Sequence, residues 1–216
     1  MKLLQVDASV LAPHSVSRRL TQDITAAWLA AHPATVVETL DLVADPVPHL
    51  GPDALASRAG NDPLTLSDAQ RREDTLSERL LTQFLEADVV VVGAPMYNFS
   101  IPSQLKAWID RLAQAGRTFK YTEHGAVGLA GGKTVFIASS RGGVYSGDNP
   151  ALQALEHQES YLRAVFGFFG ITDLRIVRAE GLAMGDLQRT EALASAAADI
   201  DRHVGSARLG EVALAA

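Results

Sequence analysis

Short β-branched runs alternate along the chain with longer segments in which apolar residues recur every three or four positions. The runs predict five strands, at Lys2–Asp7, Thr35–Leu42, Val89–Val92, Lys133–Ala138 and Thr172–Ala179. The longer segments predict helices over Arg18–Ala31, Ser67–Glu86, Ile101–Ala115, Pro150–Gly167 and Asp186–Ser206. Because strands and helices take turns without a linker, we expect residues 1–216 to form a single α/β domain, with a doubly wound parallel sheet and helices on both faces.

Four consecutive valines, Val89–Val92, make up the third run. A strand covered by helices on both faces loses the usual alternation of apolar and polar residues, so these valines predict a central strand. Pro95 has no amide donor, so we expect the strand to end there and residues 95–99 to form a loop at its carboxyl end. That edge of an open α/β sheet is where ligands bind.

Other parts of the chain are expected to face solvent or a partner. Val43–Pro63 is a long connection rich in Pro, Gly and Asp, which predicts a lid, a site wall, a partner contact or simple surface elaboration. We expect Arg117–Leu129 to be irregular and the tail after Gly205 to be loose. On the helix over 101–115, Asp110 and Arg111 are expected to belong to the solvated face.

Composition excludes several classes of function. A net charge of −6 and a pI near 5.5 argue against nonspecific binding of nucleic acid, which requires a basic surface. The absence of cysteine excludes disulfides, thiolate metal sites and iron–sulfur clusters, so redox chemistry requires a bound cofactor. The six histidines have no metal-ligand spacing, and no metal site is expected. Without a membrane-length apolar run or a signal peptide, we expect a cytoplasmic protein without membrane contact.

The loop after the first strand carries the hydroxyls of Ser9, Ser15 and Ser17 and leads into a helix. A helix N-terminus offers unpaired amides and the positive end of its dipole, so amides and hydroxyls together predict a site for a phosphate monoester. The alternative is that these serines only cap the helix, which stabilises it by about 1 kcal/mol. The loop contains neither Gly-x-Gly-x-x-Gly nor Gly-Lys-Ser/Thr, which argues against a dinucleotide-binding loop and a P-loop.

Two further strands end in loops suited to a flat ligand. Pro95–Phe99 follows the third strand, and Ser139–Gly143, in which two glycines let the backbone approach a ring closely, follows the fourth. In a flavodoxin-like sheet of order 2-1-3-4-5, the first, third and fourth strands are neighbours, and FMN binds between the first and the third. The three loops would then converge, which favours FMN over a dinucleotide.

Four strings carry a resemblance to a known family: PMYNF at 95–99, IPSQLKAWIDR at 101–111, TFKYTEHG at 118–125 and SRGG at 140–143. Together they resemble the FMN-dependent NADH-azoreductases, which are also NADH:quinone oxidoreductases, and the resemblance extends from Leu4 to about Gly185. It implies a flavodoxin-like homodimer with one FMN per subunit at the interface. It also implies NADH or NADPH as hydride donor and a quinone or azo compound as acceptor.

The resemblance further implies a role for each loop. The phosphate would be held by Ser9, Ser15, Val16 (through its amide) and Ser17. The isoalloxazine ring would be lined on one flank by Pro95, Met96, Tyr97, Asn98 and Phe99, and on the other by Ser140, Arg141, Gly142 and Gly143. Aromatic walls of the substrate pocket are expected from Phe119, Tyr121 and Phe166, within one subunit or across the dimer. Ordinary core packing is the alternative for Phe166 and for its neighbours Phe168 and Phe169.

The implied mechanism has two half-reactions in one pocket. Hydride passes from NADH or NADPH to N5 of the flavin, the nicotinamide leaves, and the acceptor then takes two electrons. No side chain is expected to be catalytic, because the flavin carries the chemistry. The alternative hypothesis is a noncatalytic, flavodoxin-type protein that transfers single electrons, since a fold alone does not define an activity.

Overall fold

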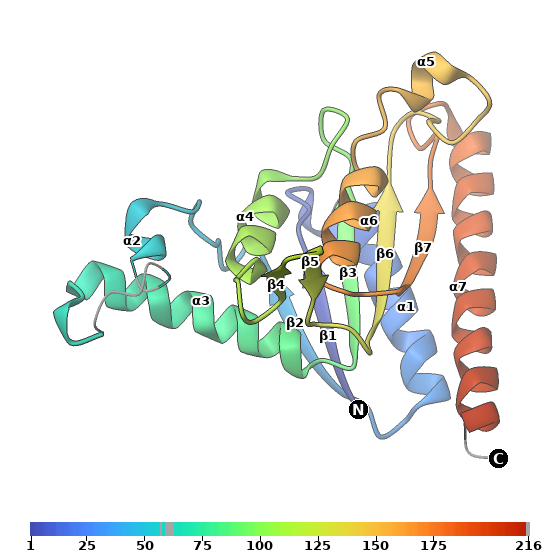
Figure 1. Ribbon diagram of the computed structural model, residues 1–216. Coiled ribbons are helices and arrows are strands. Elements are labelled where there is room, and N and C mark those ends of the chain that lie inside the picture. The colour runs from blue at the N-terminus through green and yellow to red at the C-terminus, as the bar shows by residue number, and fades with distance from the viewer. Residues whose placement is uncertain (57, 59–62, 215–216) are drawn as a thin grey trace.

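Five parallel strands form the central sheet in the order β2-β1-β3-β6-β7 (Figure 1). They are β1 (Lys2–Asp7), β2 (Val36–Asp41), β3 (Val89–Pro95), β6 (Thr134–Ser140) and β7 (Asp173–Ala179). This computed structural model describes residues 1–56, 58 and 63–214 of the chain. Numbered within the main sheet alone, the order is 2-1-3-4-5, so the predicted flavodoxin-like topology is confirmed.

Helices cover both faces of the sheet. One face carries α1 (Val16–Ala31) and α7 (Asp186–Leu214), and the other carries α3 (Asp68–Glu86), α4 (Ser103–Leu112) and α6 (Glu159–Phe168). The valines of β3 divide between the two cores, with Val89 and Val91 facing α1 and α7 and the alternate pair, Val90 and Val92, facing the other layer. Every residue of β3 is buried, as its unbroken apolar run predicts.

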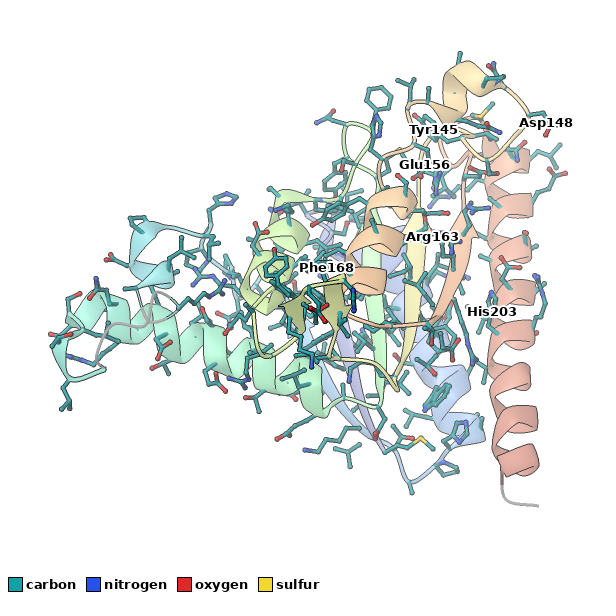
Figure 2. All side chains as sticks on the ribbon, in the orientation of Figure 1. Tyr145, Asp148, Glu156, Arg163, Phe168 and His203 are labelled. Atoms are coloured by element: carbon teal, nitrogen blue, oxygen red, sulfur yellow. The ribbon has the colours of Figure 1, made fainter. Side chains whose placement is uncertain are left out.

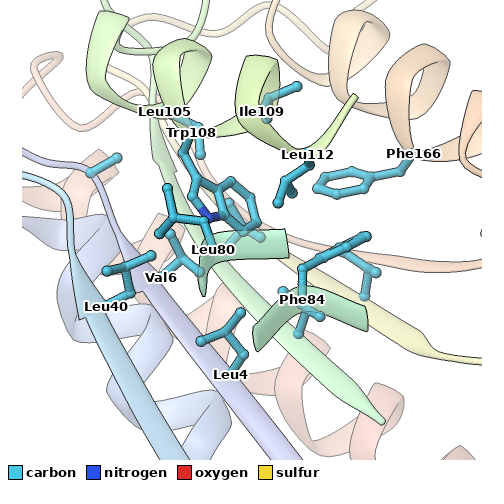
Figure 3. Close-up of a cluster of buried hydrophobic side chains, with 14 of the residues drawn as sticks. Leu4, Val6, Leu40, Leu80, Phe84, Leu105, Trp108, Ile109, Leu112 and Phe166 are labelled. Carbon is cyan, nitrogen blue, oxygen red and sulfur yellow. The ribbon is translucent and has the colours of Figure 1, made fainter. Parts of the chain in front are cut away.

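Large aromatic side chains fill the core beneath α3, α4 and α6 (Figure 3). The Phe84 ring meets Trp108 edge-on with centroids 6.0 Å apart and stacks against Phe166 at 6.3 Å. All three side chains are fully buried. Burying a phenylalanine stabilises a fold by roughly 1.5–3 kcal/mol, so this cluster fixes α3, α4 and α6 against the sheet.

The strand β3 ends at Pro95, in register with Ser140, as the missing amide donor predicts. Two other local predictions need correction. Residues 117–129 are not irregular, because β4 (Phe119–Thr122) and β5 (Gly125–Gly128) pair as an antiparallel hairpin. The Thr122 hydroxyl closes its turn by donating to the Gly125 carbonyl at 2.8 Å, a local bond that apolar periodicity does not report. The helix α7 continues past Gly205 to Leu214, where a loose tail was predicted.

The predicted helix over 150–167 is two helices, α5 (Pro150–Gln153) and α6. The break occurs because the Glu156 carboxylate accepts the amides of Gln158 at 3.0 Å, Glu159 at 2.7 Å and Ser160 at 3.1 Å, which starts a new helix. In Figure 1, α5 lies beyond the arrowheads of β6 and β7. The segment between the two helices therefore lies at the carboxyl edge of the sheet.

The long connection after β2 is tied to the body of the protein through two arginines. It contains α2 (Pro52–Leu55). Arg111 is fully buried and not on a solvated face: it pairs with Glu73 at 2.6 Å and donates to the Ser77 hydroxyl and the Pro48 carbonyl. Arg58 donates to three carbonyls at the end of α4, those of Asp110, Arg111 and Ala113. None of the described helices is long and apolar enough to cross a membrane.

Candidate functional site

The loop after β1 brings two serine hydroxyls together at the start of α1. Ser15 is the N-cap of α1 and accepts the Arg18 amide at 3.2 Å, and its hydroxyl lies 3.0 Å from that of Ser17. Both serines are buried. The amides of the first helical turn point toward this pair, since a helix cannot satisfy them internally. Ser15 therefore caps the helix, and the Ser17 hydroxyl lies beside the cap at the same helix end.

A cluster of polar side chains on β1, α1 and β2, which sequence reasoning missed, supports this loop. The buried carboxylate of Asp7 accepts the Thr21 hydroxyl at 2.7 Å and the Gln5 amide at 2.9 Å. Arg18 lies between two carboxylates, with nitrogens 3.7 Å from Asp7 and 2.8 Å from Asp41. Burial opposes ionisation of Asp41, but bonds from the Val43 amide and from Arg18 outweigh it and lower its pKa. These contacts turn the Arg18 guanidinium toward the sheet.

The loop after β3 is a tight two-residue turn. The amide of Tyr97 donates to the Ser100 carbonyl at 2.9 Å, and the Ser100 amide donates to the Tyr97 carbonyl at 3.1 Å. The two central residues, Asn98 and Phe99, have φ of 49° and 72°, as in a type I′ turn. Glycine is favoured at the second central position, so a phenylalanine there is strained. The Phe99 side chain is 44% exposed at the carboxyl edge.

Hydrogen bonds join the loops after β1 and β3. The hydroxyls of Ser9 and Tyr97 lie 3.2 Å apart, and the Val10 amide donates to the same tyrosine oxygen at 3.2 Å. Ser9 also accepts the Leu11 amide at 3.3 Å. The strands that carry these loops are adjacent, so the predicted convergence of the two loops is confirmed at atomic contacts.

The loop after β6 packs against the segment after β7. Arg141 donates its amide to the Ala179 carbonyl at 3.0 Å, and the carbonyls of Gly142 and Gly143 accept amides from residues 183 and 181. A Cβ on Gly142 would come within 3.3 Å of the Ala183 side chain, and one on Gly143 within 3.2 Å of the Tyr145 ring. A side chain at either position would thus require its neighbour to shift by a few tenths of an ångström. The Ser140 carbonyl accepts the Met96 amide at 2.8 Å, which joins this loop to the turn after β3.

The Arg141 side chain does not project over the edge of the sheet. It is buried and paired with Glu159, and its guanidinium lies 5.9 Å from the centre of the Tyr145 ring. Arg178 approaches Glu159 from β7 with two hydrogen bonds, of 2.8 and 2.6 Å. Burial opposes ionisation of Glu159, but the bond from Arg178 and the charges of both arginines outweigh it and lower its pKa. Arg141 can therefore contribute only backbone to a ligand at the edge.

The three predicted aromatic walls do not lie with these loops. Phe166 is fully buried in the core, where it packs against Phe84 and Phe169, so it cannot line an open pocket in this chain. Phe119 is 9% exposed and packs at 4.5 Å on Phe168, at the end of α6 away from the carboxyl edge (Figure 2). Tyr121 is on the same hairpin and is 75% exposed. The core alternative is thus correct for Phe166.

The residues at the edge suit a phosphorylated flavin. The paired serine hydroxyls at a helix N-terminus supply donors for a phosphate, and the exposed turn after β3 supplies backbone and an aromatic ring for a flat group. Among the described residues, no three His, Asp or Glu side chains gather as a possible metal site.

Comparison with known proteins agrees with this geometry. A sequence model of the flavodoxin-like fold family matches residues 1–204, so the chain belongs to that family. A protein of Polaromonas naphthalenivorans named FMN-dependent NADH:quinone oxidoreductase is 61% identical over 199 residues, which is 92% of this chain and 91% of the relative. A protein of the same name from Delftia acidovorans is 55% identical over 216 residues and covers both chains fully. Within the flavodoxin-like fold, the chain is a member of the FMN-dependent NADH:quinone oxidoreductase family.

Solved structures agree with the sequence relatives. The chain superposes on an FMN-dependent NADH-azoreductase from Bacillus anthracis, solved in complex with FMN, with a TM-score of 0.85 and 30% identity. The match covers 95% of this chain and 98% of that one. Another azoreductase of Bacillus anthracis gives a TM-score of 0.82 and 35% identity over 96% of this chain and 98% of the other.

Proposed function

We propose that this protein is an FMN-dependent NADH:quinone oxidoreductase that also reduces azo compounds. The observation that carries the proposal is the bond between Ser9 and Tyr97, because it joins a phosphate-type loop to a ring-type loop at the switch point of the sheet. The names of the relatives support FMN as cofactor and NADH as donor, and they favour an enzyme over a single-electron carrier. The whole chain serves as one FMN-binding domain in a cytoplasmic protein.

The phosphate of FMN would lie at the start of α1. The hydroxyl of Ser17 and the amides of Val16 and Ser17 would donate to its oxygens, while Ser15 holds the helix end in place. Ser9 would act chiefly by fixing the loop, since its hydroxyl already bonds to Tyr97 and the Leu11 amide. No lysine or arginine is needed at this site, because amides and hydroxyls can satisfy a monoester.

The ring would lie between the turn after β3 and the loop after β6. Residues 95–99 would line one flank and residues 140–143 the other, with backbone atoms near the pyrimidine edge. Bound FMN would supply the redox chemistry, accepting hydride from NADH or NADPH at N5 and delivering two electrons to a quinone or azo acceptor in a second half-reaction. The protein contributes orientation and exclusion of water, and the exposed Phe99 ring offers a stacking surface for the flat reactants.

A homodimer would allow Tyr121 to line a substrate pocket. Tyr121 is 75% exposed on a hairpin far from its own turn at 97–100, so a second subunit could receive it as a pocket wall. The exposed apolar side chains at the carboxyl edge, Val10, Leu11 and Phe99, would be covered in the same assembly.

Anaerobic spectroscopy tests this proposal. The purified protein is loaded with FMN, and its visible spectrum is recorded before and after one equivalent of NADH, then of NADPH, and finally of a quinone. We expect immediate bleaching by a nicotinamide and full recovery on addition of quinone. Bound FMN that is bleached by dithionite but by neither nicotinamide would favour the electron carrier. Failure to bind FMN at all would refute the proposal.

A further inference from the structure

A third segment of the chain contacts both flanks of the proposed ring site, which are residues 95–99 and 140–143. Residues 156–158 lie between α5 and α6, Glu159 is the first residue of α6, and together they contact both the turn after β3 and the loop after β6. Figure 2 places Glu156 and Tyr145 close to the arrowhead of β6, at the carboxyl edge.

On the β3 side, the contacts go to backbone atoms around the turn. The amide of His157 donates to the Phe99 carbonyl at 3.0 Å, and the Ser100 hydroxyl donates to the His157 carbonyl at 3.3 Å. Gln158 is fully buried, and its side-chain amide donates to the carbonyl of Ala94, two residues before Met96. These bonds hold both ends of the strained turn.

On the β6 side, the contacts go to side chains at the end of the strand. The Gln158 oxygen accepts the hydroxyl of Ser139 at 3.3 Å, and that hydroxyl also accepts Arg141 at 3.1 Å. Glu159 then pairs with Arg141 and Arg178, which joins β6 to β7. A single buried residue, Gln158, thus bonds to the ends of β3 and β6 at once.

We infer that Gln158 is a positioning residue that fixes the two loops on either side of the flavin ring, because it adds side-chain bonds to Ala94 and Ser139, which are already paired between β3 and β6; the inference rests on the proposed function. Its two bonds are made within the sheet edge and leave the ring itself untouched. A buried carbonyl or hydroxyl that loses its partner is costly, so the loops would shift to recover a bond if Gln158 were removed. Both bonds of Gln158 go to β3 and β6, whereas the phosphate site at the start of α1 follows β1, so that site would keep its geometry.

Paired binding measurements with FMN and riboflavin test the inference, because riboflavin has the ring but no phosphate. Gln158→Leu keeps the volume and removes both bonds, and Ser139→Ala removes only one of the two, together with the bond from Arg141. We expect Gln158→Leu to raise the Kd of both flavins by the same factor, about tenfold, and to slow reduction by saturating NADH. Ser139→Ala should raise both Kd values by about threefold, and it provides a second test if Gln158→Leu does not fold.

Lys133→Met provides a matched control. Lys133 is also buried and donates to two backbone carbonyls, those of Leu85 and Ala87, but at the opposite edge of the sheet. Lys133→Met should lower the Tm, as Gln158→Leu does, and should leave the Kd of FMN and of riboflavin unchanged.

Wild-type Kd values for riboflavin and an unchanged reduction rate in both Gln158→Leu and Ser139→Ala would overturn the inference. A rise in the Kd of FMN alone would also overturn it, since that result places Gln158 with the phosphate. A wild-type protein that binds neither flavin would instead refute the proposed function.

Discussion

The carboxyl and amino edges of the sheet differ in their backbone strain and in the hydrogen bonds that their residues make. The carboxyl edge holds the three described non-glycine residues with positive φ, Ala12, Asn98 and Phe99, and its loops share buried hydrogen bonds. At the amino edge, Lys133 and Lys2 bond to the end of α3 and to Glu86, as ordinary caps and ion pairs do. Yet a large groove, of about 1060 Å³, lies at this amino edge, between α3 and the first halves of β1 and β2.

The volume of the groove therefore favours a site at the amino edge, whereas the strained backbone and shared hydrogen bonds favour one at the carboxyl edge. The groove is lined by exposed charges, including the pair of Lys2 with Glu86, in which each side chain is more than half exposed. Such pairs contribute about 0–1 kcal/mol each and hold no geometry in place. Strained backbone together with polar groups shared between loops is the better indicator of a site, because both persist only where the surrounding structure determines them.

The largest expected difference between the edges is in the energy of their ion pairs. Glu159→Gln should lower the free energy of unfolding by about 3 kcal/mol at neutral pH, the low end for breaking a buried pair, since Glu156 and Glu180 also lie near Arg141. Glu78→Gln, at the groove, should cost less than about 1 kcal/mol. Urea denaturation of both variants measures the difference.

The pH dependence of the same variants sharpens this comparison. The pKa of Glu159 is lower in the folded than in the unfolded protein, so its contribution is complete above the ordinary glutamate pKa of about 4.3 and is lost as the pH falls through the folded value. The gap between wild type and Glu159→Gln should therefore close in acid. A gap that stays constant down to acid pH would mean that the buried charge is not the cause.

The next effect concerns the phosphate site. Ser17→Asp should abolish FMN binding, because it places a carboxylate against the phosphate, and Ser17→Ala should weaken binding roughly 10- to 100-fold. Fluorescence titration measures both, and riboflavin binding should change little in Ser17→Ala. Gln22→Asp adds the same charge to an exposed position further along α1 and serves as control. Unchanged FMN affinity in both Ser17 variants would contradict the placement of the phosphate.

The smallest effect tests whether strain at the carboxyl edge serves function. Phe99→Gly should relieve the left-handed conformation and raise the stability of the apoprotein by up to about 1 kcal/mol, offset in part by loss of the contact with Tyr145. Quinone reduction should become slower, because the exposed ring is gone. The pair of measurements is urea denaturation and steady-state turnover. A variant that is both less stable and equally active would show that the turn is ordinary.

The sequence predicted the sheet well because periodicity reports burial directly. The valines at 89–92 indicate a strand buried on both faces, and the neighbouring runs fix the order of elements. The local errors arise where a side chain, and not the apolar period, decides the structure. Glu156 ends one helix and begins another, and the Thr122 hydroxyl closes a hairpin turn. Neither residue departs from a plausible helix or loop pattern.

The candidate site was predictable in position and less so in its details. Strand ends rich in Ser, Gly and Pro indicated the three loops, but a loop sequence does not report where long side chains turn. Arg141 and Arg111 are both buried in ion pairs, although Arg141 stands among serines and glycines in the sequence and Arg111 follows Asp110. Phe166 recurs at helical spacing with the other core residues, so its period favoured the core over a pocket. Gln158 had no local signal, because both of its partners are distant in the chain.

The bond between Ser9 and Tyr97 has a kinetic consequence. It joins two groups of the chain itself, so the entropy of ordering the two loops is a cost of folding and not of association. At the proposed site, a flavin would therefore meet phosphate and ring subsites at a fixed spacing, without a slow closure of one loop onto the other. Cofactor loading would then be limited by diffusion and desolvation at the rim, and the residence time by the contacts that the two loops make.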